Sequence, residues 1–209
     1  MGFVPLSNFI DRWHQAPAVA DKVRAMVALA PESLAGLRDR ALLLLGFAGA
    51  FRRSELVALD VADITETKSG LLVTIRRSKT DQEGEGATIA IARGDVACPA
   101  RALLEWLDAA GIKAGPIFRP INKACTVAAE RLTDRSVANI VKAYAARAGF
   151  DVSTFSGHSL RAGFLTSAAA KGASIFKMMD VSRHKSVDTL RGYVRDAELF
   201  KDHADAGLL

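Results

Sequence analysis

The sequence has few cysteines and no long apolar run, and both shortages narrow its class. Only two cysteines occur in 209 residues, Cys98 and Cys125, and they do not form a C-x-x-C pair. This argues against a disulfide framework or a cysteine-based zinc site and favours free thiols in a reducing compartment. The most apolar run, residues 41–51, is too short to cross a bilayer. The N-terminus lacks the basic and apolar segments of a signal peptide, so we expect a cytoplasmic protein.

Clustered acidic residues are also missing, which argues against a metal-dependent nuclease. Composition is otherwise that of an ordinary globular chain, with 50% hydrophobic and 24% charged residues. Lys and Arg number 28 against 23 Asp and Glu, a net charge of +5. This excess permits a polyanionic partner such as nucleic acid but does not establish one.

Hydrophobic periodicity predicts a mainly α-helical chain without internal repeats. Residues 1–17 form a lead-in that carries a short helix before Pro17, and one compact domain follows over 18–209. Ser54, Asp134 or Ser136, and Ser156 are the expected N-caps. We expect helices at about 18–30, 36–50, 54–59, 99–111, 134–149, 156–171, 175–179 and 186–201, and a short one within 112–133.

The segment 61–93 differs from the rest because β-branched residues alternate with polar ones around a glycine-bearing turn. We predict two antiparallel strands, near 71–77 and 87–92, with Lys79 in the hairpin between them. Lys68, Arg76 and Arg77 are nearby cations that could take any role assigned to Lys79.

The stretch from Ser156 to Tyr193 carries the side chains most suggestive of chemistry. His158 and Arg161 are three residues apart, so a helix would place them on one face. His184 follows, and Tyr193 comes nine residues after it. A guanidinium can hold two phosphate oxygens, an imidazole can transfer protons near neutral pH, and a phenol can act as a nucleophile. Together they point to a phosphodiester substrate.

A second arginine lies upstream, in the segment Phe51-Arg52-Arg53-Ser54-Glu55-Leu56 that follows a helix apolar on all sides. Arginines placed against a buried apolar helix are costly unless an anion binds there. The alternative is a pair of surface arginines at a helix junction.

The order Arg-x-Ser-Glu-Leu, hairpin lysine, His-x-x-Arg, His and Tyr resembles the catalytic domain of the tyrosine recombinases, which include phage integrases and Xer- and Cre-like enzymes. The resemblance spans about residues 18–205. It implies an α+β fold that is mainly helical, with a small three-stranded antiparallel sheet. It also implies site-specific DNA recombination through a covalent 3′-phosphotyrosyl intermediate.

The resemblance assigns a role to each matching residue. Tyr193 would be the nucleophile, Arg52 and Arg161 would clamp the non-bridging phosphate oxygens, and Lys79 would protonate the 5′-oxygen leaving group. No metal ion and no cofactor would be required, because the protein–DNA linkage conserves the energy of the broken bond.

Three further residues complete this implied site. His158 would be a proton-transfer partner, His184 would hydrogen-bond the scissile phosphate, and Glu55 would be a buried acidic support. Arg53, beside Arg52, remains an alternative for the first arginine.

The sequence departs from the family pattern at two positions that the family often fills with glycine. Ala50 stands two residues before the first arginine, with Gly49 adjacent, and Arg183 stands directly before the third motif's histidine. Ala162-Gly163 also follows the His-x-x-Arg motif where many relatives have a histidine. None of these changes removes a catalytic group.

The resemblance also implies partners and a setting. Double-stranded DNA would be the substrate, bound by a homotetramer in which residues of about 196–209 dock on a neighbouring protomer. Without DNA we expect a monomer, in a bacterial or phage-encoded, nucleoid-associated protein with no membrane contact. The N-terminal core-binding domain usual in the family is not recognisable in this sequence.

Two rival functions are compatible with the same residues. A type IB-like topoisomerase would relax supercoils without exchanging partners, and a non-cleaving DNA-binding module would keep the fold alone.

Overall fold

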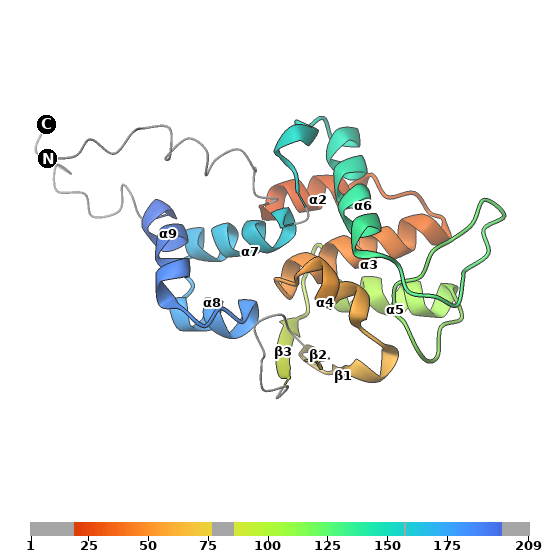
Figure 1. The fold of residues 1–209 in the computed structure, drawn as a ribbon, viewed down its shortest axis with the longest axis horizontal. Coiled ribbons are helices and arrows are strands. Elements are labelled where there is room, and N and C mark those ends of the chain that lie inside the picture. Colours follow the sequence, from red (N-terminus) through yellow and green to blue (C-terminus); the bar gives the residue numbers. More distant parts are fainter. Residues whose placement is uncertain (1–18, 77–85, 157, 198–209) are drawn as a thin grey trace, which may run out of the picture.

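The described part of this computed structural model comprises residues 19–76, 86–156 and 158–197, and it is mainly helical, as predicted. A three-stranded antiparallel sheet accompanies the helices, which confirms the expected fold class (Figure 1). The helices are α2 (Ala20–Ala28), α3 (Leu34–Ala48), α4 (Arg53–Ala58), α5 (Pro99–Ala109), α6 (Asp134–Arg147), α7 (Ser159–Ala170), α8 (Ile175–Ser182) and α9 (Val187–Ala197), with short 3₁₀ turns η2 (Val61–Asp63) and η3 (Val152–Thr154).

Helix α3 is central to the larger hydrophobic core. Residues 41–45 are all buried, in agreement with the apolar run seen in the sequence. Gly46 allows close packing, because a Cβ there would lie 3.0 Å from Leu160 of α7 and 3.1 Å from Leu56 of α4. Trp106 of α5 is fully buried and donates its indole N–H to the Ile117 carbonyl at 2.9 Å. The core therefore joins α3 directly to α4 and α7, the two helices whose N-terminal ends carry the candidate arginines Arg52 and Arg161.

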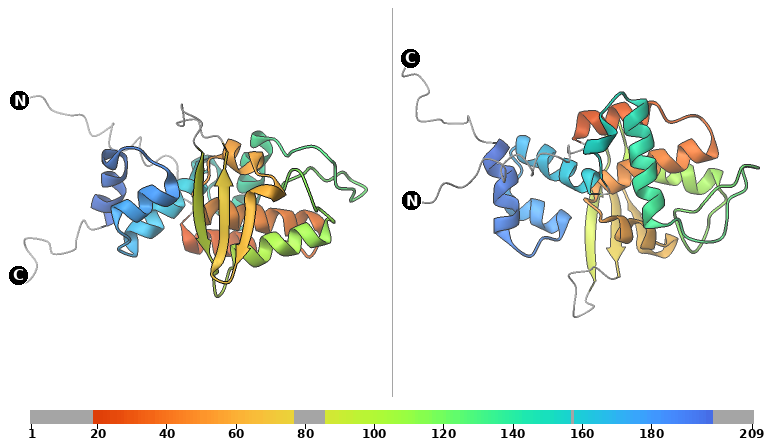
Figure 2. Two further views of the ribbon diagram at one scale, coloured as in Figure 1. Left: turned by 90° about the horizontal axis from the view of Figure 1, so that it is seen from below. Right: turned by 45° about the horizontal axis from the view of Figure 1, so that its top comes forward.

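The sheet consists of β1 (Ile64–Thr67), β2 (Gly70–Ile75) and β3 (Ala87–Ala92) in the order β1-β2-β3. Register pairs Val73 with Ile64 on one side and with Ile89 on the other. Side chains alternate across the sheet, so Val73 is buried whereas Leu72 is 40% exposed. Figure 2 shows the strands lying along one side of the helical body. The predicted strands are confirmed with a shorter β2, and Lys79 lies outside the described residues.

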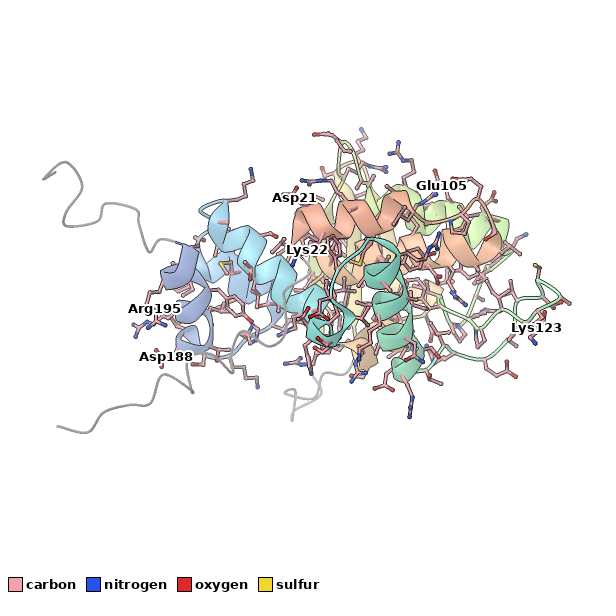
Figure 3. The ribbon with its side chains drawn as sticks, turned by 90° about the horizontal axis from the view of Figure 1, so that it is seen from above. Asp21, Lys22, Glu105, Lys123, Asp188 and Arg195 are labelled. Atoms are coloured by element: carbon pink, nitrogen blue, oxygen red, sulfur yellow. The ribbon has the colours of Figure 1, made fainter. Side chains whose placement is uncertain are left out.

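A second hydrophobic cluster is formed by the C-terminal helices. Leu165 and Ala169 of α7, Met178 of α8 and Leu190 of α9 are buried together, and Tyr193 packs against them. Figure 1 shows α7, α8 and α9 grouped at one side of the molecule. In Figure 3, Asp188 and Arg195 of α9 lie at the opposite end from Lys123, which belongs to the loop before α6. Helix α7 connects the two clusters, because its first turn packs into the larger one through Leu160.

Three predicted helix caps are wrong. Helix α4 begins at Arg53, and its N-cap is Arg52 rather than Ser54, two residues earlier than expected. Helix α6 is capped by the Thr133 hydroxyl, which accepts from the Ser136 amide at 3.1 Å. The N-cap of α7 is His158 rather than Ser156, so His158 precedes the helix instead of sharing a helical face with Arg161. In each case the predicted cap, a serine or an aspartate, lies within a few residues of the true N-cap. Sequence spacing alone does not show which of these neighbouring residues caps the helix.

The short helix expected within 112–133 is also wrong. This segment is described throughout and runs as a loop, with one isolated bridge between Ile121 and Val127 and another between Asp60 and Pro116. Arg131 explains part of its course, because its guanidinium donates to the Ala58 carbonyl at 2.8 Å and to the Asp60 carboxylate at 2.7 Å. The loop thereby caps the C-terminal end of α4.

The expected short helix before Pro17 and the tail beyond Ala197 lie outside the described residues. Of the helices that are described, none combines the length and apolar character needed to cross a membrane.

Leu190 provides a test of the second cluster. Its side chain is fully buried, so Leu190→Ala should lower the free energy of unfolding by about 2–5 kcal/mol and speed amide hydrogen exchange in α9. The matched change at a half-exposed strand position, Leu72→Ala, should alter stability by no more than about 0.5 kcal/mol. Urea denaturation and hydrogen exchange of the three proteins measure this; equal destabilisation by both substitutions would contradict the assigned packing.

Candidate active site

The turn between α3 and α4 places Arg52 beside a buried carboxylate. Glu55 is only 2% exposed, and its two oxygens accept from Arg52. The Arg52 amide donates to Oε2 at 2.9 Å, and its Nη1 donates to Oε1 at 2.5 Å. Burial alone would raise the pKa of Glu55, but the charge of Arg183 and the hydrogen bonds from Arg52 outweigh it and hold that pKa below its ordinary value. Glu55 is therefore an ionised anchor that orients Arg52.

Arg161 reaches the same turn from the first turn of α7. The residue is 6% exposed, and its Nη1 donates to the Ala50 carbonyl at 2.6 Å. Burial, followed by the charges of Arg52 and Arg183, lowers the pKa of Arg161 to about 10, so the guanidinium stays protonated at neutral pH. Arg52 and Arg161 are thus close enough to repel one another. Both side chains also contact the α3–α4 turn, Arg161 through the Ala50 carbonyl and Arg52 through Glu55.

His184 lies against Arg161. The Nη2 of Arg161 is 3.3 Å from Nε2 and 3.4 Å from Nδ1 of the imidazole, and the Ser182 hydroxyl is 2.8 Å from Nδ1. Burial, then the charges of Arg161 and Arg52, lowers the pKa of His184 to about 4. The imidazole is therefore neutral at pH 7, with one nitrogen available as a donor and the other as an acceptor.

His158 lies at the edge of the same group. Its amide donates to the Ser156 hydroxyl at 3.2 Å, and partial burial together with the charges of Arg53, Arg161 and Arg52 lowers the pKa of the ring. Arg53, the alternative to Arg52, is thus also near the site, but it is Arg52 that pairs with Glu55.

Tyr193 approaches from α9. An ionised Tyr193 phenol would raise the pKa of Arg161, which indicates that the two side chains lie near one another. The ring itself packs against the C-terminal cluster. The structure thus brings Arg52, Glu55, His158, Arg161, His184 and Tyr193 to one place from α4, α7, α9 and the loops beside them.

Arg183 belongs to this site although the sequence assigned it no role. Its Nη2 donates to Glu55 Oε2 at 2.7 Å and to the Ala50 carbonyl at 3.1 Å, and only 8% of its side chain is exposed. The sign of it in the sequence was an arginine at a position where the family usually has glycine. That difference did not show which residues the arginine would contact.

The lysine of the proposed site, Lys79, cannot be placed, because it lies outside the described residues. Of its competitors, Arg76 is engaged elsewhere: its Nε donates to Asp63 at 2.6 Å and its Nη1 to Asp60 at 3.2 Å. Lys68 lies in the turn between β1 and β2. Among the residues whose placement is described, no group of three or more His, Cys, Asp or Glu side chains could hold a metal ion.

Comparison with known proteins matches most of the chain to one family. The model of the phage integrase family matches residues 19–199. The chain is 49% identical over 175 residues to an integrase/recombinase XerD homolog of Selenomonas ruminantium, covering 83% of this chain and 51% of that protein. It is 33% identical over 172 residues to the tyrosine recombinase XerD of Xanthomonas axonopodis pv. citri, covering 81% and 55% respectively.

Solved structures show the same fold at low identity. The XerH recombinase in a post-cleavage complex with its palindromic difH substrate matches with a TM-score of 0.72 at 16% identity, over 92% of this chain and 53% of that one. A lambda integrase dimer bound to a COC′ core site matches with a TM-score of 0.64 at 16% identity, over 87% and 48%.

The chain spans about half the length of the relatives that it matches. Within that half, the family match begins before α2 and ends beyond α9, so it includes every element that contributes to the site. The chain therefore belongs to the phage integrase family, the tyrosine recombinases.

Proposed function

We propose that this chain supplies the catalytic site of a site-specific recombinase that cleaves and rejoins DNA strands through a 3′-phosphotyrosyl intermediate. The observation that carries the proposal is the proximity of Arg52, Arg161 and His184: Arg161 lies against the His184 imidazole, and the charge of Arg52 acts on both.

The two arginines are suited to the charge that develops during phosphoryl transfer. Negative charge in the transition state spreads over the non-bridging oxygens, and fixed guanidiniums stabilise it without reorganising. Arg52 is held by Glu55 and Arg161 by the Ala50 carbonyl, so both are oriented before substrate binds. The neutral His184 imidazole adds a hydrogen-bond donor without adding charge.

The proposed reaction is a transesterification. The Tyr193 oxygen forms a bond to phosphorus, the bond to the 5′-oxygen breaks, and the phenol's proton is lost as the leaving oxygen gains one. The cations nearby favour the phenolate form of a group whose ordinary pKa is near 10. His158 is the proposed proton-transfer partner and Lys79 the proposed acid. Attack by another 5′-hydroxyl reverses the step, so neither ATP nor a metal ion is part of the proposal.

Double-stranded DNA is the proposed partner. Support comes from the DNA complexes formed by proteins of the same fold and from the positive charge gathered at the site. Assembly as a homotetramer on DNA, with the tail docked on a neighbouring protomer and a monomer in the absence of DNA, remains part of the proposal. So does a cytoplasmic location.

Tyr193→Phe tests the nucleophile. On a nicked suicide substrate the wild-type chain should accumulate a covalent protein–DNA adduct in EDTA without nucleotide, and Tyr193→Phe should form none, because phenylalanine has no attacking oxygen. DNA affinity should change by less than about threefold, since one hydroxyl contributes little to a phosphate-dominated contact. Denaturing gels and filter binding measure the two quantities.

Tyr144→Phe is the matched control, because the only other tyrosine is buried on α6 away from the site. Adduct from Tyr193→Phe at the wild-type yield would refute the assignment. A type IB-like topoisomerase would also form the adduct, so exchange between two defined sites is the measurement that separates recombination from supercoil relaxation. A non-cleaving module would form no adduct.

The protonation state of His184 predicts a pH dependence. Its pKa is about 4 in the folded chain against an ordinary 6.5, so the unfolded chain binds the extra proton between these values. Stability should therefore fall as pH falls through this window. Because the pKa of Glu55 is lowered in the folded chain, protonation of this carboxylate reduces stability only below its ordinary pKa of 4.5. A comparison of pH 7 with pH 5 therefore reports on His184 and not on Glu55.

Thermal unfolding midpoints at these two pH values should differ less in His184→Gln than in the wild type. His158 is more exposed than His184, so His158→Gln should change this difference between the two midpoints less than His184→Gln does. Identical pH dependence in wild type and His184→Gln would contradict a neutral, desolvated His184.

Truncation after Ala197 tests the tail, and it retains all of α9. Removing 198–209 should weaken tetramer formation on DNA by at least about tenfold, because docking in trans adds a second attachment per protomer. Binding of a single protomer to a half-site should stay within about threefold. Light scattering and gel mobility measure the two. Unchanged assembly by the truncated chain would count against trans docking.

A further inference from the structure

The backbone at Arg183 would suit glycine better than arginine. Arg183 ends α8 in the left-handed region, with φ 58° and ψ 36°. Residues with a Cβ are disfavoured there, and Arg183 is one of three described non-glycine residues with positive φ. An arginine at this position is therefore expected to gain something from its side chain that offsets the backbone cost.

The side chain crosses from the end of α8 to the α3–α4 turn and is almost fully enclosed there. Its Nη1 donates to the carbonyls of Gly49, at 3.0 Å, and Val181. Its Nη2 donates to Ala50 and Glu55, and the guanidinium lies 5.2 Å from the centre of the Phe51 ring. The Phe51 ring in turn lies on Gly49, where a Cβ would come within 2.2 Å of it.

Two of these acceptors also hold the arginines of the site. The Ala50 carbonyl accepts from both Arg183 and Arg161, and the Glu55 carboxylate accepts from both Arg183 and Arg52. Ala50 is itself left-handed, with φ 46°, so its carbonyl direction is a strained one that these donors stabilise. Arg183 is thus hydrogen-bonded to the acceptor that holds Arg161 and to the acceptor that holds Arg52.

Arg183 also changes the charge of the site. Glu55 carries one negative charge and is shared between Arg52 and Arg183. With Arg161 the group has three positive charges against one negative, an excess of two; without Arg183 the excess is one. Glu55 would then neutralise Arg52 alone, which would weaken the attraction of Arg52 for phosphate.

We infer that Arg183 is a positioning residue for phosphodiester cleavage: it fixes the Ala50 carbonyl and the Glu55 carboxylate, and through them the Arg161 and Arg52 guanidiniums. Its own terminal nitrogens are occupied by protein acceptors, so it orients the clamp rather than touching substrate. The inference rests on the proposed function, and it extends the site to a side chain that the glycine usual in the family at this position does not have.

Arg183→Gly is the main variant, because glycine accepts the left-handed backbone and removes only the side chain. On the suicide substrate at saturating DNA, its single-turnover cleavage rate should fall by at least about tenfold, because the two guanidiniums lose their shared supports. DNA affinity should stay within about threefold of wild type. Arg183→Lys keeps one charge but cannot bridge several acceptors, so an intermediate rate is expected; it also serves if the glycine variant does not fold.

Arg93→Gly is the matched control. Arg93 likewise donates to one carboxylate, Glu66, and to the carbonyls of Lys68 and Thr67, but it lies beside the sheet. Its loss should leave cleavage at the wild-type rate, so a defect specific to Arg183 cannot be ascribed to the loss of any bridging arginine.

A methylphosphonate at the scissile position separates positioning from general structural damage. This linkage lacks the charge on one non-bridging oxygen, so its cleavage depends less on the positions of Arg52 and Arg161. The loss of cleavage rate caused by Arg183→Gly should therefore be at least about threefold smaller on the methylphosphonate than on the phosphodiester. A wild-type rate for Arg183→Gly, or an equal defect on both linkages, would overturn the inference.

Inorganic phosphate distinguishes failure of this inference from failure of the proposed function. Titrated against the DNA-free chain by calorimetry, phosphate should bind Arg183→Gly at least about fivefold more weakly than wild type or Arg93→Gly. Should the wild-type chain form no adduct, the proposed function fails and the phosphate titration decides whether Arg183 organises an anion site. Equal phosphate affinities would then overturn the inference as well.

Discussion

A single buried carboxylate underlies the arrangement of the site. Glu55 is removed from water, and an ionised group there is tolerated only when its lone pairs are taken by cationic or amide donors. Arg52 and Arg183 provide those donors from positions more than 120 residues apart in the sequence. Because the carboxylate needs both, the end of α8 is bound to the start of α4. The direction of Arg52 follows from that requirement.

The arginines in turn determine the state of the histidines. Burial and the charges of the arginines lower the pKa of both His184 and His158, to about 4 for His184. A cationic imidazole would add to the positive charge of the neighbouring arginines, whereas a neutral one offers directional hydrogen bonds. In the proposed reaction the guanidiniums would carry the charge, and the imidazoles would provide hydrogen-bond donors and acceptors.

Much of the fold was accessible from sequence because it follows from periodicity. The apolar run of α3 and the alternation in β2 and β3 identified their own elements. The N-caps were harder to predict from the sequence. Ser54, Ser156 and Thr133 are all residue types that can cap a helix, but only Thr133 does so in the structure. The first strand, β1, was implied only by the family resemblance, because its short segment ITET carries no buried residue.

The site likewise has residues that the sequence identified and contacts that it did not. Arg52, Glu55, Arg161, His184 and Tyr193 could be named from motif order. The link between Arg183 and Glu55 could not, because it joins distant positions and depends on a left-handed backbone at each end of the contact with Ala50.

The presence of two hydrophobic clusters has a consequence for how such a protein can fail. Arg52 belongs to the turn above the larger cluster, and Tyr193 to a helix packed on the smaller one. Apolar burial governs whether each half folds, whereas their mutual alignment depends on α7, on the edge-to-face pair of Phe47 and Phe164, and on ionic contacts across the seam. A chain can therefore retain its fold and thermal stability yet hold the proposed nucleophile, Tyr193, out of line with the two arginines proposed to bind phosphate. In this architecture, inactivity and unfolding are separable defects.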